Sequence, residues 1–178
     1  MQLSSGMATL DTAILEPNTA RILLVDDSAI ARAVVGRGLK AAGMQVEEAR
    51  GGEEALRLLA AGNYDVVITD LCMPGIDGFA VLASVKSRTP ATEVVILSGI
   101  EDVERAVEGL RLGAHSFLPK PPAYPEQVLF TVRRALETKQ LRDRCAHLQA
   151  KLAAVEPRGV RVTAARRTHE PRQVAAAG

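Results

Sequence analysis

The sequence predicts an α/β fold: a doubly wound, five-stranded parallel sheet with helices on both faces. From residue 21 onward, short β-branched runs alternate with amphipathic stretches, which is the pattern of strand–helix–strand units. Three of these runs are apolar apart from a single Thr, as strands covered on both faces should be. Five strands and five helices fit into about 120 residues, and no internal repeat is found, so one three-layer domain is expected.

The strands are expected at residues 22–25 (ILLV), 45–49 (QVEEA), 66–69 (VVIT), 94–97 (VVIL) and 116–118 (SFL). The first, third and fourth are the apolar runs, so we expect them at the centre of the sheet. The second and fifth contain polar residues and are expected at its edges.

Four helices are expected between the strands or after them, at residues 29–42, 52–61, 79–87 and 102–112. Each is followed by a residue that commonly ends a helix: Gly43, Gly62, Pro90 and Gly113. A fifth helix begins near Pro125, a favourable first-turn residue, and is longer than the others.

The two ends of the chain differ from this pattern. Residues 1–20 show no sustained period, so a flexible arm is expected before a domain at residues 21–138. Residues 139–156 continue the last helix. Residues 157–178 are rich in Arg, Pro, Gly and Ala, which is typical of a disordered basic tail.

Apolar residues continue along the last helix at alternating spacings of four and three: Leu141, Cys145, Leu148, Leu152 and Val155. This seam is typical of a short coiled coil and predicts a parallel homodimer through residues 139–155. In such a pair the two copies of Cys145 would face each other across the two-fold axis. Two heptads are marginal alone, so the alternative is a frayed, solvent-exposed extension.

Composition narrows the function classes. The 22 Lys and Arg balance 21 Asp and Glu, and the basic tail lacks aromatic residues, so nucleic-acid binding is not expected. Cys72 and Cys145 lie far apart without metal-ligand spacing, which favours a reducing, cytoplasmic compartment and no zinc site. No apolar run approaches the roughly 18 residues of a transmembrane helix, so no membrane insertion is expected.

Polar residues follow four of the five strands. Asp26 and Asp27 come directly after the first strand, Asp70 after the third, Ser98 after the fourth, and Lys120 just beyond the fifth. Because the carboxyl ends of parallel strands share one edge of a sheet, these side chains should converge there. Single strand-end Asp residues are often caps or turn formers, but that reading does not account for four strand ends together.

Three carboxylates in one pocket repel one another, so the predicted site needs cations. Lys120 supplies one positive charge. Mg²⁺ is the natural second cation, because it prefers carboxylate oxygens and retains several waters.

The motifs ILLVDDS, VVITDLCMPGIDG, VVILSG and FLPKP occur in this order along the chain. Together they resemble the receiver domain of bacterial two-component response regulators. The resemblance implies a flavodoxin-like strand order of 2-1-3-4-5. It also implies a phosphoryl acceptor served by a sensor histidine kinase or a histidine phosphotransfer protein. Such a protein is a stoichiometric phosphoacceptor, with Mg²⁺-dependent self-phosphorylation and self-dephosphorylation, rather than an enzyme with turnover.

Taken position by position, the resemblance makes Asp70 the phosphoacceptor and a ligand of Mg²⁺. Asp27 would bind the metal directly, and Asp26 would bind it through water. The backbone carbonyl of Cys72 would complete the protein ligands, and Lys120 would pair with a phosphoryl oxygen.

Ser98 would donate a hydrogen bond to another phosphoryl oxygen, and Ser98 with Phe117 resembles the hydroxyl and aromatic switch pair of the family. Their movement would repack the face formed by the fourth helix, fifth strand and fifth helix, where a downstream effector protein would bind. Taken without the resemblance, an aromatic residue such as Phe117 in SFL is most often simply a core residue.

Two function classes stay open. Phosphorylation-dependent signalling to a partner protein is favoured by the acidic residues and Lys120. The alternative is a dimerisation or interaction module of the same fold that acts without phosphorylation. If the chain is a fragment of a longer regulator, the last helix would be a linker to a missing output domain.

Overall fold

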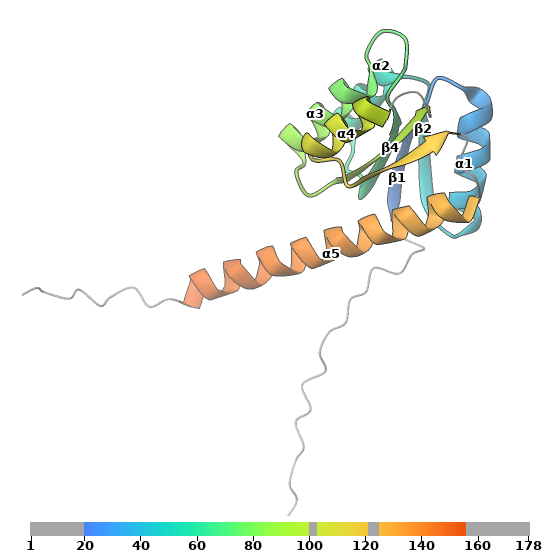
Figure 1. Ribbon diagram of the computed structural model, residues 1–178. Helices are drawn as coiled ribbons and strands as arrows, with labels where there is room; N and C mark the ends of the chain where they lie inside the picture. The colour runs from blue at the N-terminus through green and yellow to red at the C-terminus, as the bar shows by residue number, and fades with distance from the viewer. Residues whose placement is uncertain (1–19, 100–102, 121–124, 156–178) are drawn as a thin grey trace, which may run out of the picture.

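The computed structural model describes residues 20–99, 103–120 and 125–155, and it confirms the predicted α/β architecture (Figure 1). Of the arm expected at residues 1–20, all but Ala20 lies outside the described residues, as does the tail expected at 157–178. The elements, in chain order, are β1 (Arg21–Val25), α1 (Ala29–Ala41), β2 (Gln45–Ala49), α2 (Gly52–Ala61), β3 (Val66–Asp70), α3 (Gly78–Arg88), β4 (Glu93–Gly99), α4 (Val103–Arg111), β5 (Ser116–Lys120) and α5 (Pro125–Val155).

The five strands form one parallel sheet in the order β2-β1-β3-β4-β5, as predicted. β1, β3 and β4 are central, and almost all their side chains are buried. β2 and β5 are the edges, with half-buried side chains along much of their length. Because the chain crosses from β1 outward to β2 and then back to β3, the sheet has a switch point between β1 and β3.

Two apolar clusters join the helices to the sheet. α1 and α5 cover one face, where Leu39 and Val132 pack against Leu24 and Ile68. α2, α3 and α4 cover the other face (Figure 1). Each fully buried Leu or Val contributes about 1.5–3 kcal/mol of transfer free energy, so these two layers hold the strand ends in fixed positions.

α5 is one continuous helix of 31 residues, as the extended apolar pattern predicts. At 1.5 Å per residue it is about 46 Å long, longer than the sheet it covers. Val128, Val132, Ala135 and Leu136 are buried against the domain. The C-terminal part of α5 runs past the edge of the domain (Figure 1).

Four strands extend beyond the predicted runs: β1 and β3 by one residue each, and β4 and β5 further. β4 begins at Glu93, whose side chain is 1% exposed, and β5 continues to Lys120. A charged residue inside a central strand has no signal in a hydrophobic pattern. Its burial follows instead from partners that other elements bring to it, described below.

Candidate functional site

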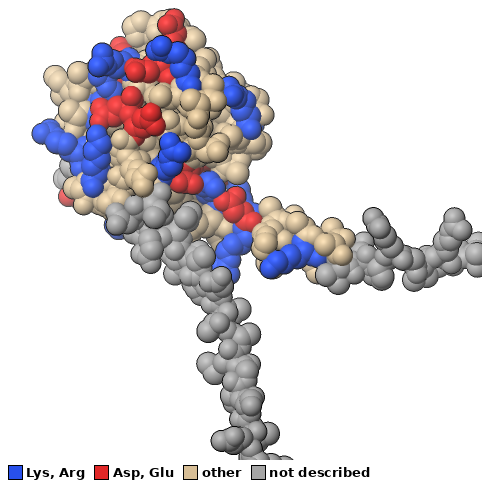
Figure 2. Space-filling model, turned by 180° about the vertical axis from the view of Figure 1, so that it is seen from behind, with Lys and Arg blue, Asp and Glu red and all other residues tan. Residues whose placement is uncertain are grey.

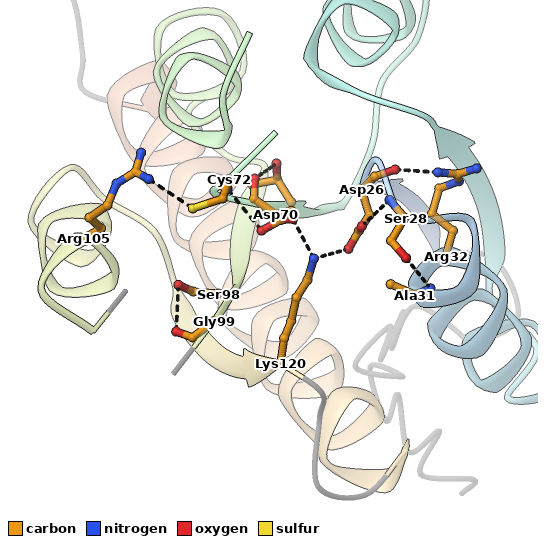
Figure 3. A network of polar contacts seen from close by, with 11 residues as sticks. Asp26, Ser28, Ala31, Arg32, Asp70, Cys72, Ser98, Gly99, Arg105 and Lys120 are labelled. Carbon is orange, nitrogen blue, oxygen red and sulfur yellow. Dashed lines mark hydrogen bonds and ion pairs between the residues drawn. The ribbon is translucent and has the colours of Figure 1, made fainter. Parts of the chain in front are cut away.

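The carboxyl ends of β1, β3, β4 and β5 bring together the side chains that the sequence places there (Figure 3). Asp26 and Asp27 follow β1, Asp70 is the last residue of β3, and Lys120 is the last residue of β5. In the register of the sheet, Asp70 lies opposite Leu97 and Lys120 lies opposite Gly99. The predicted convergence at one edge is therefore present.

Three carboxylates form the centre of the site. Carboxylate oxygens of Asp26, Asp27 and Asp70 all lie within 4.8 Å of one another. Asp26 is fully buried, Asp70 is 6% exposed, and Asp27 is exposed to solvent. Hard oxygen donors at this separation, open to solvent on one side, fit a divalent cation that keeps some of its water.

Lys120 reaches into this cluster. Its Nζ donates to Asp70 Oδ2 at 2.6 Å and lies 2.5 Å from Asp26 Oδ2 (Figure 3). Burial lowers the pKa of the Lys120 ammonium, but the contacts with Asp26 and Asp70 outweigh burial, so its pKa is raised. With one ammonium against three carboxylates, these four groups carry a net charge of −3 + 1 = −2. The donor set and its excess charge fit Mg²⁺.

The turn from β1 into α1 holds Asp26 in place. The backbone N–H of Ser28 donates to Asp26 Oδ1 at 2.9 Å, and the Ser28 hydroxyl caps α1 by accepting from the Ala31 N–H at 3.3 Å. Arg32 Nη1 donates to the backbone carbonyl of Asp26 at 2.6 Å. Sequence reasoning missed Arg32, whose only signal is a basic residue one turn into the first helix.

The loop from β3 to α3 packs tightly against Asp70. A Cβ on Gly78 would lie 2.1 Å from the Asp70 carbonyl oxygen, so no larger residue fits without a backbone shift. Gly75 has φ +75°, a left-handed conformation that favours glycine. The Cys72 N–H donates to Asp70 Oδ1 at 3.2 Å. The loop thus orients the carboxylate from the side opposite Lys120.

The Cys72 thiol lies at the rim of the site. Arg105 Nη1 of α4 donates to Cys72 Sγ at 3.1 Å, and Arg105 also pairs with Asp77 at 3.5 Å and lies over the ring of Phe79. Sequence reasoning missed Arg105 too, because nothing in the spacing of α4 indicates how far a long side chain reaches.

Ser98 and Phe117 lie on neighbouring strands. Ser98 is 1% exposed, and its hydroxyl donates to the Gly99 carbonyl at 3.4 Å, a weak bond that leaves it free to change partner. Phe117 lies opposite Ile96 in the register and is half-buried in the apolar cluster under α3 and α4.

An apolar cavity of about 350 Å³ opens beside Lys120. It lies along α1, and one of its lining residues, Ile30, is 78% exposed. The lining residues are Ser28, Ile30, Ala31, Val34, Val35, Leu97 and Lys120.

None of the helices among the described residues combines the length and hydropathy that crossing a membrane requires.

Comparison with known proteins defines the family. The response regulator receiver domain family matches residues 22–133, which is more than half of the chain. The chain therefore belongs to the response regulator receiver domain family.

Relatives agree with this assignment. The chain is 47% identical over 103 residues to the gliding motility regulatory protein of Myxococcus xanthus, a match covering 56% of this chain and 13% of that protein. It is 37% identical over 119 residues to the DNA-binding transcriptional regulator NtrC of Escherichia coli (strain K12), covering 67% and 25%. The crystal structure of NtrX from Brucella abortus with ADP matches with a TM-score of 0.70 and 32% identity, covering 73% of this chain and 30% of that chain.

Each of these matches covers less than a third of the relative's own length. The similarity is therefore to only part of each relative.

Proposed function

We propose that this chain accepts a phosphoryl group on Asp70 from a sensor histidine kinase or a histidine phosphotransfer protein and passes the signal to an effector protein. The observation that carries the proposal is the Asp70 carboxylate, paired with Lys120 and adjacent to Asp26 and Asp27. Family membership supports it. Phosphoryl transfer requires a positioned nucleophile and neutralised charge, and this site offers both.

In the proposed reaction, a carboxylate oxygen of Asp70 attacks the phosphorus of a phosphohistidine. A new oxygen–phosphorus bond forms, the phosphorus–nitrogen bond breaks, and the released imidazole nitrogen takes a proton from solvent. Lys120 pairs with a phosphoryl oxygen, and the Ser98 hydroxyl turns from the Gly99 carbonyl to donate to another. The transfer is stoichiometric, because each chain accepts one phosphoryl group on Asp70. Later hydrolysis of the acyl phosphate returns the chain to its starting state.

Mg²⁺ would be held by Asp27 and Asp70 directly, by Asp26 through water, and by the backbone carbonyl of Cys72. When bound, the ion supplies positive charge to the phosphoryl oxygens. The burial of Asp26 and the exposure of Asp27 support this division, because an exposed carboxylate can meet an ion that arrives from solvent.

The proposed output is a change in the surface formed by α4, β5 and α5. When Ser98 turns toward the phosphoryl group, Phe117 moves further into the space it leaves. Exposed apolar residues of this surface support a role in protein binding: Val107, Leu110, Leu112 and Phe130. On the other side of the site, the cavity beside Ile30 suits the phosphodonor protein. We place the reaction in the cytoplasm, where ATP serves the kinase.

The metal assignment is tested by titrating Mg²⁺ into the full chain and into Asp27→Ala, with Glu53→Ala as an exposed control. Asp27→Ala should lose Mg²⁺ binding, and Glu53→Ala should bind as the unmodified chain does. Equal affinity in all three proteins would refute the ligand role of Asp27.

Hydrogen exchange separates the two function classes. With acetyl phosphate and Mg²⁺, exchange in α4 and β5 should change in the unmodified chain and stay constant in Asp70→Asn and Ser98→Ala. If exchange is the same with and without the phosphodonor although Asp70 is phosphorylated, the module acts without phosphorylation, as the alternative holds.

A further inference from the structure

The second half of α5 carries an apolar stripe that the domain does not cover. Leu141, Leu148 and Leu152 are 63%, 58% and 69% exposed, and Cys145 is exposed as well. Their spacing of four, three and four is the heptad pattern of a coiled coil. We refer to these four residues as the α5 stripe.

A buried carboxylate fixes the helix that bears the stripe. Arg142 Nη1 donates to Oε1 of Glu93, the first residue of β4. Glu93 is 1% exposed, and its other oxygen lies 3.9 Å from Lys86 Nζ of α3 and 3.8 Å from His115 Nδ1. Truncating a partner of a buried charge is costly, so this cluster holds α5 to the domain beyond its apolar contacts.

A second ion pair lies one turn earlier. Lys139 Nζ lies 3.7 Å from Asp65 Oδ1, in the loop before β3, and 2.6 Å from Asp143 Oδ2 on its own helix. Charged residues of both signs gather where α5 leaves the domain, as Figure 2 shows. Lys139 and Arg142 together bind α5 at the end of the sheet opposite the phosphorylation site.

These anchors set the rotation of the helix. At about 100° per residue, the α5 stripe lies about 140° around the helix from the side that contacts the domain. That side is defined by Val128, Val132, Ala135, Leu136, Lys139 and Arg142. The α5 stripe therefore faces away from its own domain and is presented to another molecule.

We propose that the α5 stripe pairs with the same stripe of a second copy of this chain, as a parallel, in-register two-helix coiled coil. Identical stripes are complementary under a two-fold axis, since each Leu meets its own counterpart. The pairing is independent of phosphorylation of Asp70 and goes beyond the proposed phosphotransfer.

Charges beside the stripe favour the parallel orientation. Arg144 and Lys151 lie on one flank, and Arg142 and Gln149 lie on the other. In a parallel pair, each Arg144 meets the second copy's Gln149 without repulsion. In an antiparallel pair centred on the stripe, the flank with Arg144 and Lys151 would face the same flank of the second copy. Each Arg144 would then lie next to the Lys151 of the other copy, which gives two repulsive pairs. The charges beside the stripe therefore favour the parallel orientation of two identical helices.

The anchors also favour association. A coiled coil of two heptads is marginal when its helices must form on binding. Here the helix continues from a segment already folded against the domain, so the stripe is ordered before a partner arrives.

The oligomeric state is tested by analytical ultracentrifugation of the full chain, without phosphodonor, at tens to hundreds of micromolar. The unmodified chain should be a dimer, and the double variant Leu148→Asp, Leu152→Asp should be a monomer. The matched control, Ala146→Asp with Ala150→Asp, adds the same charge off the stripe and should remain a dimer. A monomeric unmodified chain, or a dimer that survives in the Leu double variant, would overturn the proposal.

Orientation is tested by oxidation in a Cys72→Ser background. Cys145 should form an interchain disulfide, whereas Cys145→Ser with Ala146→Cys should not. A dimer in which Cys145 fails to cross-link would contradict the parallel register.

The anchor is tested with Glu93→Gln and, in case that protein does not fold, with Arg142→Gln. The dissociation constant should rise several-fold, with faster hydrogen exchange in residues 139–155. An unchanged dissociation constant in a folded variant would contradict the contribution of the anchor.

Discussion

At the scale of single residues, the site is defined by an imbalance of charge. Asp26 and Asp70 share the ammonium of Lys120, and Asp27 stands beside them in solvent. The ammonium holds the buried carboxylates in place. In the proposed reaction it also pairs with a phosphoryl oxygen. Lys120 therefore has two roles that can be separated by experiment.

We predict that Lys120→Met slows phosphorylation of Asp70 on the order of a hundredfold, the cost of removing one charge-stabilising donor. Mg²⁺ binding should not weaken, because the carboxylates remain and a competing cation is gone. Stopped-flow phosphorylation and a parallel Mg²⁺ titration measure the two effects. If Lys120→Met lost Mg²⁺ binding but kept its phosphorylation rate, Lys120 would act on the metal site and not on the phosphoryl group, contrary to this prediction.

Much of this site is predictable from the sequence, for a topological reason. Parallel strands end at one edge, so Asp26, Asp70 and Lys120 meet wherever the strands are correctly located. Arg32 and Arg105 were not predicted, since their contacts depend on how long side chains on helices bend toward a loop. Periodicity specifies the face of a helix and not the reach of its side chains.

At the scale of elements, the start of α3 depends on the absence of a side chain. Gly78, the first residue of α3, lies so close to the end of β3 that an added Cβ would clash with the Asp70 carbonyl oxygen. The sequence shows Gly78 as a turn residue, but the close contact with β3 is visible only in the structure.

We predict that Gly78→Ala lowers the free energy of unfolding by about 1–3 kcal/mol, the usual cost of overpacking, and impairs phosphorylation of Asp70. Gly38→Ala is the control, because no atom lies within 4 Å of its added Cβ in the last turn of α1. It should stabilise the chain by about 0.5–1 kcal/mol. Urea unfolding followed by circular dichroism measures both changes, and equal effects from the two substitutions would contradict the packing argument.

The start of β4 at Glu93 was not predicted from the sequence. Glu93 belongs to a central strand, although hydrophobicity places charged residues outside. Its burial is possible because Lys86, His115 and Arg142 come from three separate parts of the chain. Such long-range pairing leaves no local signal in the sequence.

His115 makes this cluster sensitive to acid. Burial lowers the pKa of His115 below its usual 6.5, more than the nearby Glu93 raises it; Arg142, Lys86 and Arg134 also lower it. The unfolded chain then binds the proton more readily than the folded chain. The contribution of His115 to stability is therefore present above pH 6.5 and is lost as the pH falls below that value.

We predict that the stability of the unmodified chain falls more steeply below pH 6.5 than that of His115→Asn. Urea midpoints measured at a series of pH values give the two slopes. Parallel slopes would show that the imidazole is not held in its neutral form.

At the scale of the whole molecule, the sheet separates two charged centres. The acidic site lies at the carboxyl ends of the strands, and the Glu93 cluster holds α5 at the opposite end. The apolar runs predicted which strands are central and which are edges, and the heptad spacing predicted the long last helix. The full strand order followed from the resemblance to receiver domains. The direction in which the α5 stripe points was not predicted, because it depends on the ion pairs of α5 with Asp65 and Glu93.

The central claim is that Asp70 is the phosphoacceptor of a Mg²⁺-dependent receiver. The most direct test is intact mass spectrometry of the full chain after incubation with acetyl phosphate and Mg²⁺. We predict the added mass of one phosphoryl group, which is lost on acid treatment, absent in EDTA and absent in Asp70→Asn. The same acid-labile adduct on Asp70→Asn, at equal stoichiometry, would contradict it.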